Sequence, residues 1–233
     1  MAKQYTLPVD QYSEQTFDNF VLGSNEELVK QLRNSADQFS GFWIYGRKAN
    51  GRSHLLRAKC LQDDREKNKK SHYVGCESLS DLRSERYMPL KLALKHGETV
   101  AIDDIDLYLG QKDFELILFD IYQRLVEIKG TLLVSHKSSA LVTEFVVPDL
   151  GSRLRALMAF QIKELRDSHK STFLIERAAA RGFHLSANVI NYWLSHGPRD
   201  MHALISDFEI LAEVMLVKKQ LLTIPLFKEV LGY

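Results

Sequence analysis

The sequence has 233 residues, of which 45% are hydrophobic and 26% are charged, and these values are ordinary for a globular protein. The 31 basic and 30 acidic side chains leave a formal net charge of +1, which excludes a strong overall attraction to nucleic acid or to an anionic membrane. Cys60 and Cys76 have no paired spacing, so we expect neither a disulfide framework nor a cysteine-based metal site. The sequence shows neither a secretory signal nor an apolar run of membrane-spanning length, so a cytoplasmic protein is expected.

Short apolar runs alternate with longer periodic segments through most of the chain. This alternation predicts an α/β domain with a parallel sheet, because short apolar runs are typical of buried strands and three- and four-residue spacing is typical of helices. We expect strands at 41–46, 71–76, 98–106 and 130–135, and helices at 53–61 and 113–129.

The character of the sequence changes after about residue 164, where helical patterns follow one another without a strong strand signal. One helix is expected to end at Gly182, a second to run from the Ser186 cap to Gly197, and a third, long helix to begin with Pro198. We therefore divide the chain into a flexible tail (1–12), an α/β domain (13–163) and a small all-helical domain (164–233).

The segment that follows the first strand has the spacing of a phosphate-binding loop. Gly46, Gly51 and Ser53 keep the G-x-x-x-x-G-[K/R]-[ST] pattern between a strand and a helix, with Arg52 where such loops usually carry lysine. Backbone N–H groups in such a loop point at a phosphate. Arginine preserves the positive charge as a planar fork, so we expect nucleotide binding to survive better than hydrolysis. An ordinary strand-to-helix turn containing glycines would show the same spacing.

Polar residues also follow two later strands. Asp103 and Asp104 end the apolar run in "VAIDDID", where a phosphate-loop protein places carboxylates that hold Mg²⁺ and orient water. Ser135 and His136 end the run in "LLVSHKSSA", where a sensor of the γ-phosphate would lie. An acidic turn and a polar loop are the alternatives for the two segments, but their order and spacing favour one shared edge of a parallel sheet.

Six segments together resemble the AAA+ module of the replication initiator DnaA, within the DnaA/Hda group of the AAA+ family. They are "FDNFVLGSNEEL", "GRSHLL", "AIDDID", "DLGSRL", "GPRDMHAL" and "LTIPLFKEVL", and the similarity spans nearly the whole chain. The resemblance implies an AAA+ phosphate-loop domain followed by a helical lid.

The resemblance also implies roles by position. Val21 and Leu22 would line an adenine pocket, and Arg199 would reach the nucleotide from the lid as sensor 2. Arg153 in "GSRL" resembles an arginine finger, which acts on the nucleotide of a neighbouring molecule, although Arg155 is an alternative. The residues implied around the phosphates and a possible Mg²⁺ ion are Gly46, Asn50, Gly51, Arg52, Ser53, His54, Asp103 and Asp104, with Ser53 and Asp103 as the metal ligands. The implied cofactor is ADP or another adenine nucleotide.

The N-terminal segment "QYTLPV" resembles a short motif that binds the replication sliding clamp. Gln4 would enter a polar niche of the clamp, and Leu7 and Pro8 would fill an apolar groove. A disordered anchor of this kind can reach a partner without disturbing the fold.

The function implied by the resemblance is negative regulation of replication initiation. The chain would dock on ATP-bound DnaA at the DNA-loaded clamp and promote ATP hydrolysis there through Arg153, with weak or no ATPase of its own. We expect the chain to self-associate. We expect neither sequence-specific DNA binding nor a membrane partner. The alternatives are an autonomous AAA+ ATPase and a DnaA-related adaptor that loads the replicative helicase.

Overall fold

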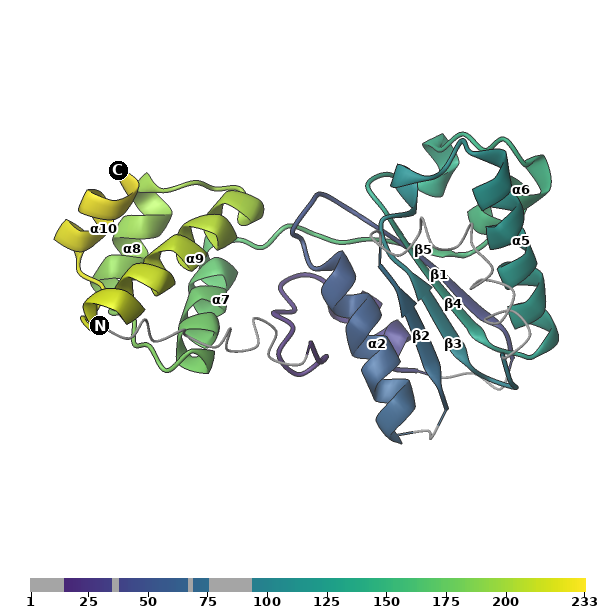
Figure 1. The fold of residues 1–233 in the computed structure, drawn as a ribbon, viewed down its shortest axis with the longest axis horizontal. Coiled ribbons are helices and arrows are strands. Elements are labelled where there is room, and N and C mark those ends of the chain that lie inside the picture. Colours follow the sequence, from purple (N-terminus) through teal and green to yellow (C-terminus); the bar gives the residue numbers. More distant parts are fainter. Residues whose placement is uncertain (1–14, 35–37, 67–68, 76–93) are drawn as a thin grey trace, which may run out of the picture.

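The fold is seen in a computed structural model that describes residues 15–34, 38–66, 69–75 and 94–233. The expected tail and the residue Cys76 lie outside these ranges. The described chain forms an α/β body followed by a group of helices, which we call the lid (Figure 1). Within the described ranges no helix is long and apolar enough to cross a membrane.

The body contains a five-stranded parallel sheet in the order β2-β3-β4-β1-β5. The strands are β1 Ser40–Tyr45, β2 Ser71–Val74, β3 Thr99–Ile102, β4 Thr131–His136 and β5 Met158–Gln161. The four strands expected from the sequence and the parallel sheet are confirmed. Because all strands run the same way, the residues that follow β1, β3 and β4 meet at one edge of the sheet.

Helices cover both faces of the sheet. Within the described ranges the helices of the body are α1 Glu26–Arg33, α2 Arg52–Glu66, α5 Lys112–Glu127 and α6 Pro148–Arg155, with short 3-10 turns η2 Ile105–Leu107 and η3 Ala140–Val142. Phe42 and Ile44 of β1 pack in the core with α1 and α2, whereas Trp43 packs on the opposite face with α5 and α6. This alternation follows from the two-residue period of a strand.

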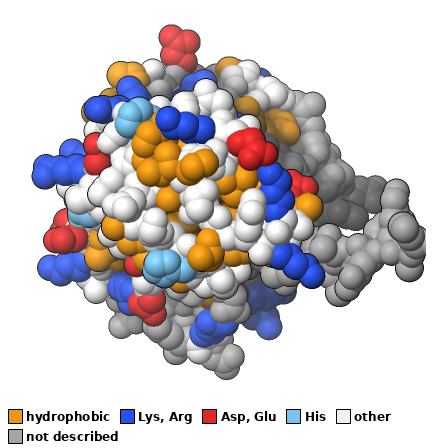
Figure 2. Space-filling view, turned by 90° about the vertical axis from the view of Figure 1, so that its left-hand side faces the viewer, with side chains coloured by type: hydrophobic (Ala, Val, Ile, Leu, Met, Phe, Trp, Pro, Cys, Tyr) orange, Lys and Arg blue, Asp and Glu red, His pale blue; other side chains and the backbone are white. Residues whose placement is uncertain are grey.

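The lid has a separate core built around Trp193, Phe208 and Phe227. Its helices are α7 Asp167–Ala180, α8 Ala187–His196, α9 Met201–Lys218 and α10 Ile224–Leu231. Figure 1 shows the lid to one side of the body, joined to it by the segment after β5. Seen from the lid end, hydrophobic side chains lie among cationic, acidic and histidine side chains, without a large area of one charge (Figure 2).

Three of the four helix limits expected in the lid are confirmed, among them the end of α8 at its C-cap Gly197. Gly182 follows α7 with φ 75, and the Ser186 side chain caps α8 by accepting a hydrogen bond from the N–H of Val189. The expectation that the long helix begins with Pro198 is wrong. Helix α9 begins at Met201, because the Asp200 side chain accepts hydrogen bonds from the N–H groups of His202 and Ala203 and so fixes the N-cap there.

Candidate nucleotide-binding site

The loop from Gly46 to Gly51 connects β1 to α2 at the shared edge of the sheet. Ala49 and Gly51 have left-handed backbone conformations, with φ 63 and φ 97. A Cβ atom on Gly51 would lie 2.6 Å from Cε2 of Phe20, so position 51 requires glycine both for its backbone and for the contact. The first turn of α2 then begins with the hydrogen bond from the N–H of Leu55 to the carbonyl of Gly51.

Arg52 is largely buried at the start of α2, with 10% of its side chain exposed. Its Nη2 atom lies 2.7 Å from Oδ1 of Asp104, and its Nη1 atom lies 3.9 Å from Oδ1 of Asp106. The arginine that replaces the usual lysine therefore pairs with the acidic residues after β3. Asp104 itself has a left-handed backbone with φ 49. Burial raises the pKa of Asp104 above its ordinary value, although the charge of Arg52 opposes this shift.

Two buried donors of the loop fit a phosphate ligand. Nη1 of Arg52 and Nδ2 of Asn50 have no hydrogen-bond acceptor among the described residues. Buried polar groups in proteins are nearly always satisfied, and phosphate oxygens are strong acceptors for guanidinium and amide groups. The local geometry therefore suits an anion held by the loop and the first turn of α2.

Asp103 is buried just after β3 and is held by three donors. The Tyr73 hydroxyl donates to its Oδ2 at 2.6 Å, and the backbone N–H of Asp104 donates to its Oδ1 at 3.2 Å. The Ser135 hydroxyl also donates to Oδ1 and accepts a hydrogen bond from the N–H of Asp104. The structure thus brings the expected residues Asp103 and Ser135 together at the ends of β3 and β4, and adds Tyr73 from β2.

Ser53 and Asp103 supply the oxygen atoms that Mg²⁺ prefers in proteins. Ser53 is half-buried in the first turn of α2, and the Asp103 carboxylate is fixed by its hydrogen bonds. In the described part of the chain no group of three or more His, Cys, Asp or Glu side chains could hold a metal ion. A magnesium ion at this edge would therefore depend on the phosphates of a nucleotide for further ligands.

The side chains of His54 and His136 are used for packing. Nε2 of His54 lies 2.7 Å from the carbonyl oxygen of Thr16, and its ring meets Phe20 edge to face. Nδ1 of His136 lies 2.8 Å from the N–H nitrogen and the carbonyl oxygen of Ser138. Burial lowers the pKa of both histidines, against the opposing effect of their backbone hydrogen bonds. The His54 side chain therefore connects Thr16 to α2. Only the backbone of His54 belongs to the first turn of α2 that would face a phosphate.

The segment around Val21 and Leu22 lies next to the beginning of the lid. A Cβ atom on Gly23 would lie 2.8 Å from Cδ2 of Leu165, just before α7. Two residues further on, the Asn25 side chain accepts a hydrogen bond from the N–H of Lys163 at 2.7 Å and donates one to its carbonyl at 3.2 Å. Leu22 is 40% exposed. These residues thus present apolar surface at the junction between body and lid.

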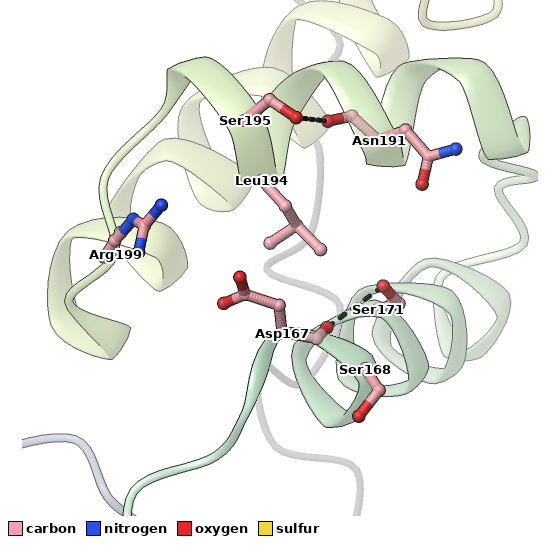
Figure 3. Close-up of a pocket in the computed structure, with 7 residues that line it drawn as sticks. All are labelled: Asp167, Ser168, Ser171, Asn191, Leu194, Ser195 and Arg199. Carbon is pink, nitrogen blue, oxygen red and sulfur yellow. Dashed lines mark hydrogen bonds between the residues drawn. The ribbon is translucent and has the colours of Figure 1, made fainter.

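Arg199 lies between α8 and α9 and lines a pocket of about 440 Å³ in the lid. Figure 3 shows Arg199 and Asp167 at one end of this pocket and Asn191 and Ser171 at the other. The backbone carbonyl of Arg199 accepts a hydrogen bond from the buried Lys170 ammonium at 2.7 Å. Within the described residues, no hydrogen bond or ion pair joins the Arg199 guanidinium to the loop at 46–53.

Arg153 and Arg155 differ clearly in their surroundings. Arg155 donates hydrogen bonds to the carbonyls of Ala140 at 3.3 Å and Thr143 at 3.0 Å, and its guanidinium lies over the ring of Phe145. Arg153 is exposed, and its side chain makes no hydrogen bond or ion pair with the residues that the structure describes. Their helix, α6, lies on the side of the body away from the lid (Figure 1).

Sequence comparison connects both parts of the chain to one group of proteins. Residues 12–160 match the model of the bacterial DnaA ATPase domain, and residues 167–231 match the model of the Hda lid domain. An uncharacterized protein of Haemophilus influenzae is 31% identical over 245 residues and covers 100% of both chains.

Structural comparison shows the same fold in solved replication initiators. Domain III of DnaA from Thermotoga maritima has a TM-score of 0.81 at 15% identity, over 95% of this chain and 97% of that chain. The AMPPCP-bound DnaA from Aquifex aeolicus has a TM-score of 0.70 at 17% identity, over 89% of this chain and 66% of that chain.

Proposed function

The chain belongs to the bacterial DnaA ATPase family of AAA+ proteins and carries a lid of the Hda type, and from this premise we propose that it is a negative regulator of replication initiation. It docks on ATP-bound DnaA and promotes hydrolysis of the ATP that DnaA holds. The product is the ADP form of the initiator. Arg153 supplies the chemistry by stabilising charge on the transferred phosphoryl group.

The surroundings of Arg153 are the observation that carries this proposal. Its guanidinium is exposed on α6, while the neighbouring Arg155 is occupied by two carbonyls of its own chain. Because α6 lies away from the chain's own loop, Arg153 suits a nucleotide bound by another molecule (Figure 1). An arginine delivered in this way accelerates phosphoryl transfer by about 10³- to 10⁵-fold. An acceleration of this size would explain the conversion of DnaA from its ATP form to its ADP form, and this chain would not need to supply a catalytic base.

Exposed apolar side chains beside α6 support a docking role for this face. Leu141 and Val142 of η3 are among the most exposed large hydrophobic residues of the described chain, and Val146 precedes α6. Hydrogen bonds from Arg155 hold η3 and the residue after it against α6. Exposed apolar side chains around a functional arginine are typical of protein interfaces.

The chain's own loop is proposed to hold ADP or another adenine nucleotide as a structural cofactor. The buried donors of Asn50 and Arg52 would bind its phosphates. Val21 and Leu22, which precede Gly23 at the junction with the lid, would line the adenine. A Mg²⁺ ion, held by Ser53 and Asp103, would neutralise phosphate charge. The nucleotide would fix the angle between body and lid and so bring Arg199 toward the phosphates.

The sliding clamp is the second proposed partner. Gln4, Leu7 and Pro8 lie outside the described residues, so this part of the proposal is based on the sequence alone. The clamp would concentrate the protein on DNA where DnaA acts, and self-association of the chain is also expected. If the tail is the anchor, Gln4→Ala should lower activity on DNA-loaded clamp without changing the fold.

Conversion of ATP-loaded DnaA to its ADP form tests the proposal. DnaA, DNA-loaded clamp and this protein are incubated together, and the nucleotide bound to DnaA is followed with time. Arg153→Ala should remove most of the stimulation, and Arg153→Lys should restore little because an ammonium lacks the planar fork. Lys30→Ala, which removes an exposed cation from α1 on the other side of the sheet, is the matched control. If Arg153→Ala stimulates hydrolysis like the parent, the proposed function is wrong.

An autonomous ATPase is the second candidate. The hydroxyl of Ser53 is present, and Asp103 is held by Ser135 and Tyr73 as a fixed carboxylate. The ion pair between Arg52 and Asp104 disfavours this candidate, because Asp104 is engaged where a residue that orients water would lie. Sustained ATP turnover by the protein alone would favour it over the proposed regulator.

A further inference from the structure

Glu115 of α5 is a fully buried carboxylate, with 0% of the residue exposed. Its Oε1 atom accepts a hydrogen bond from the N–H of Gly110 at 2.9 Å, and its Oε2 atom accepts one from the N–H of Val147 at 2.7 Å. A buried carboxylate is costly unless hydrogen bonds compensate for lost water. Both oxygens are used here, so the residue acts as a connector between two backbone segments.

One of these segments is the beginning of the helix that carries Arg153. Val147 is the N-cap of α6, and its own side chain makes no capping hydrogen bond. The carboxylate of Glu115, from a different helix, accepts the backbone N–H of the N-cap residue itself, as the N3 glutamate does in a capping box. The other segment is the turn before α5, where Gly110 has φ 87.

The other end of α6 is also fixed within the body. Arg155 reaches the carbonyls of Ala140 and Thr143, and a Cβ atom on Gly151 would lie 2.9 Å from Cδ2 of Phe145. Arg153 therefore lies on a short helix that is anchored before and after it. The exposed guanidinium can move through its own rotamers, but its backbone position is set by these anchors.

We propose that Glu115 is a positioning residue for Arg153 and that it sets the rate of hydrolysis on the partner without setting the affinity for the partner. This inference rests on the proposed function of Arg153. The carboxylate itself is buried and touches neither partner nor nucleotide. Glu115 acts only through the N-cap of α6. If the N–H of Val147 loses its acceptor, the start of α6 can shift and Arg153 can leave its productive position. Displacements of about 1 Å can reduce catalysis by about 10²-fold.

The test compares Glu115→Gln with the parent in the conversion of ATP-loaded DnaA, over a range of concentrations of this protein. The amide keeps the size of the side chain but can accept only through one atom, so one of the two backbone N–H groups loses its acceptor. We expect the maximal rate to fall by about 10-fold or more, with the half-saturating concentration unchanged. Glu127→Gln, at the exposed end of the same helix, should leave both quantities as in the parent.

A double variant separates positioning from general damage. Glu115→Gln should lower the rate in the parent but cause no further loss in an Arg153→Ala background, since the group that it positions is then missing. An equal loss in both backgrounds, or a change only in the half-saturating concentration, would overturn the positioning role. If Glu115→Gln unfolds at the assay temperature, Glu115→Asp replaces it in the test, because aspartate keeps the carboxylate on a shorter side chain. We expect its rate to lie between those of the parent and Arg153→Ala.

The outcomes for the two proposals are distinct. If Arg153→Ala is as active as the parent, the proposed function fails and the role of Glu115 fails with it. If Arg153→Ala is inactive while both Glu115 variants keep the parental maximal rate, only the positioning role is wrong.

Discussion

Two arginines outside the loop at 46–53, Arg153 and Arg199, are expected to approach nucleotides, and they are held in very different ways. Arg153 lies on α6, which is anchored to the body by Glu115 before it and Arg155 after it. Arg199 is fixed within the lid through the hydrogen bond from Lys170 to its carbonyl. Its distance from the loop therefore depends on the angle between lid and body, whereas the position of Arg153 does not.

The junction between lid and body has few specific contacts among the described residues. Asn25 forms two hydrogen bonds with the backbone of Lys163, Arg47 pairs with Glu164 at 2.8 Å, and Ala49 packs against the lid core. The junction is therefore held less firmly than α6, and this difference indicates separate roles for the body and the lid. The proposed finger lies on a helix that is anchored at both ends, and the proposed nucleotide in the chain's own loop would act on the less firmly held lid.

The largest effect is expected from Arg52→Ala, on the affinity of the chain's own loop for ADP. The buried Arg52 guanidinium would hold the proposed phosphate, and a hydrogen bond to a charged group contributes about 1.5–3 kcal/mol. We therefore expect ADP to bind about 10- to 150-fold more weakly by titration calorimetry. Arg52→Lys is the matched variant, because it restores the usual loop residue and should keep most of the affinity. An unchanged affinity in Arg52→Ala would remove the loop from the proposed nucleotide site.

Glycine substitutions compare the loop with the turn before α5. Gly51→Ala places a methyl group against Phe20 in a left-handed conformation, and it should lower the free energy of unfolding by roughly 2 kcal/mol or more. Gly110→Ala has a similar φ of 87 but no heavy atom within 4 Å of the added Cβ, so only backbone strain of about 1–2 kcal/mol applies. Chemical denaturation measures both. Equal losses would show that the contact with Phe20 contributes nothing.

The sequence predicts the loop and most of the fold because those signals are local. Gly51 and Arg52 lie within one short motif, and the strands follow from runs of apolar residues. The supporting residues were missed because their partners are distant in sequence. Tyr73 meets Asp103 across 30 residues, Glu115 meets Val147 across 32 and Asn25 meets Lys163 across 138. Only the fold brings such pairs together.

Asn25→Ala tests whether the junction is held by side-chain contacts. The variant loses both hydrogen bonds to Lys163, whose backbone can then be hydrated, so we expect a modest loss of about 1 kcal/mol. The sharper readout is limited proteolysis in the linker at 162–166, which should become faster. Asn34→Ala, an exposed position at the end of α1, is the control and should not change the cleavage rate. If cleavage of Asn25→Ala is as slow as in the parent, the hydrogen bonds between Asn25 and Lys163 do not govern the junction.

The smallest effect is expected inside the lid, at Glu209. Its burial tends to raise its pKa, but the hydrogen bonds and charges of Arg177 and Arg181 outweigh this and hold the pKa below the ordinary value. Because the folded-state pKa is lowered, the stabilisation is complete above the ordinary pKa of 4.5 and is lost as the pH falls through the lowered value. These are partly exposed groups, so Glu209→Gln should cost no more than about 1 kcal/mol at pH 7.

Thermal unfolding of the parent and Glu209→Gln at several pH values measures this contribution. The difference between them should stay constant from about pH 7 to pH 5 and should shrink only below the ordinary glutamate pKa. Glu213→Gln, on the same helix and without an ion pair among the described residues, controls for the removal of a negative charge. A difference that grows as the pH falls would have the wrong sign for this ion-pair cluster.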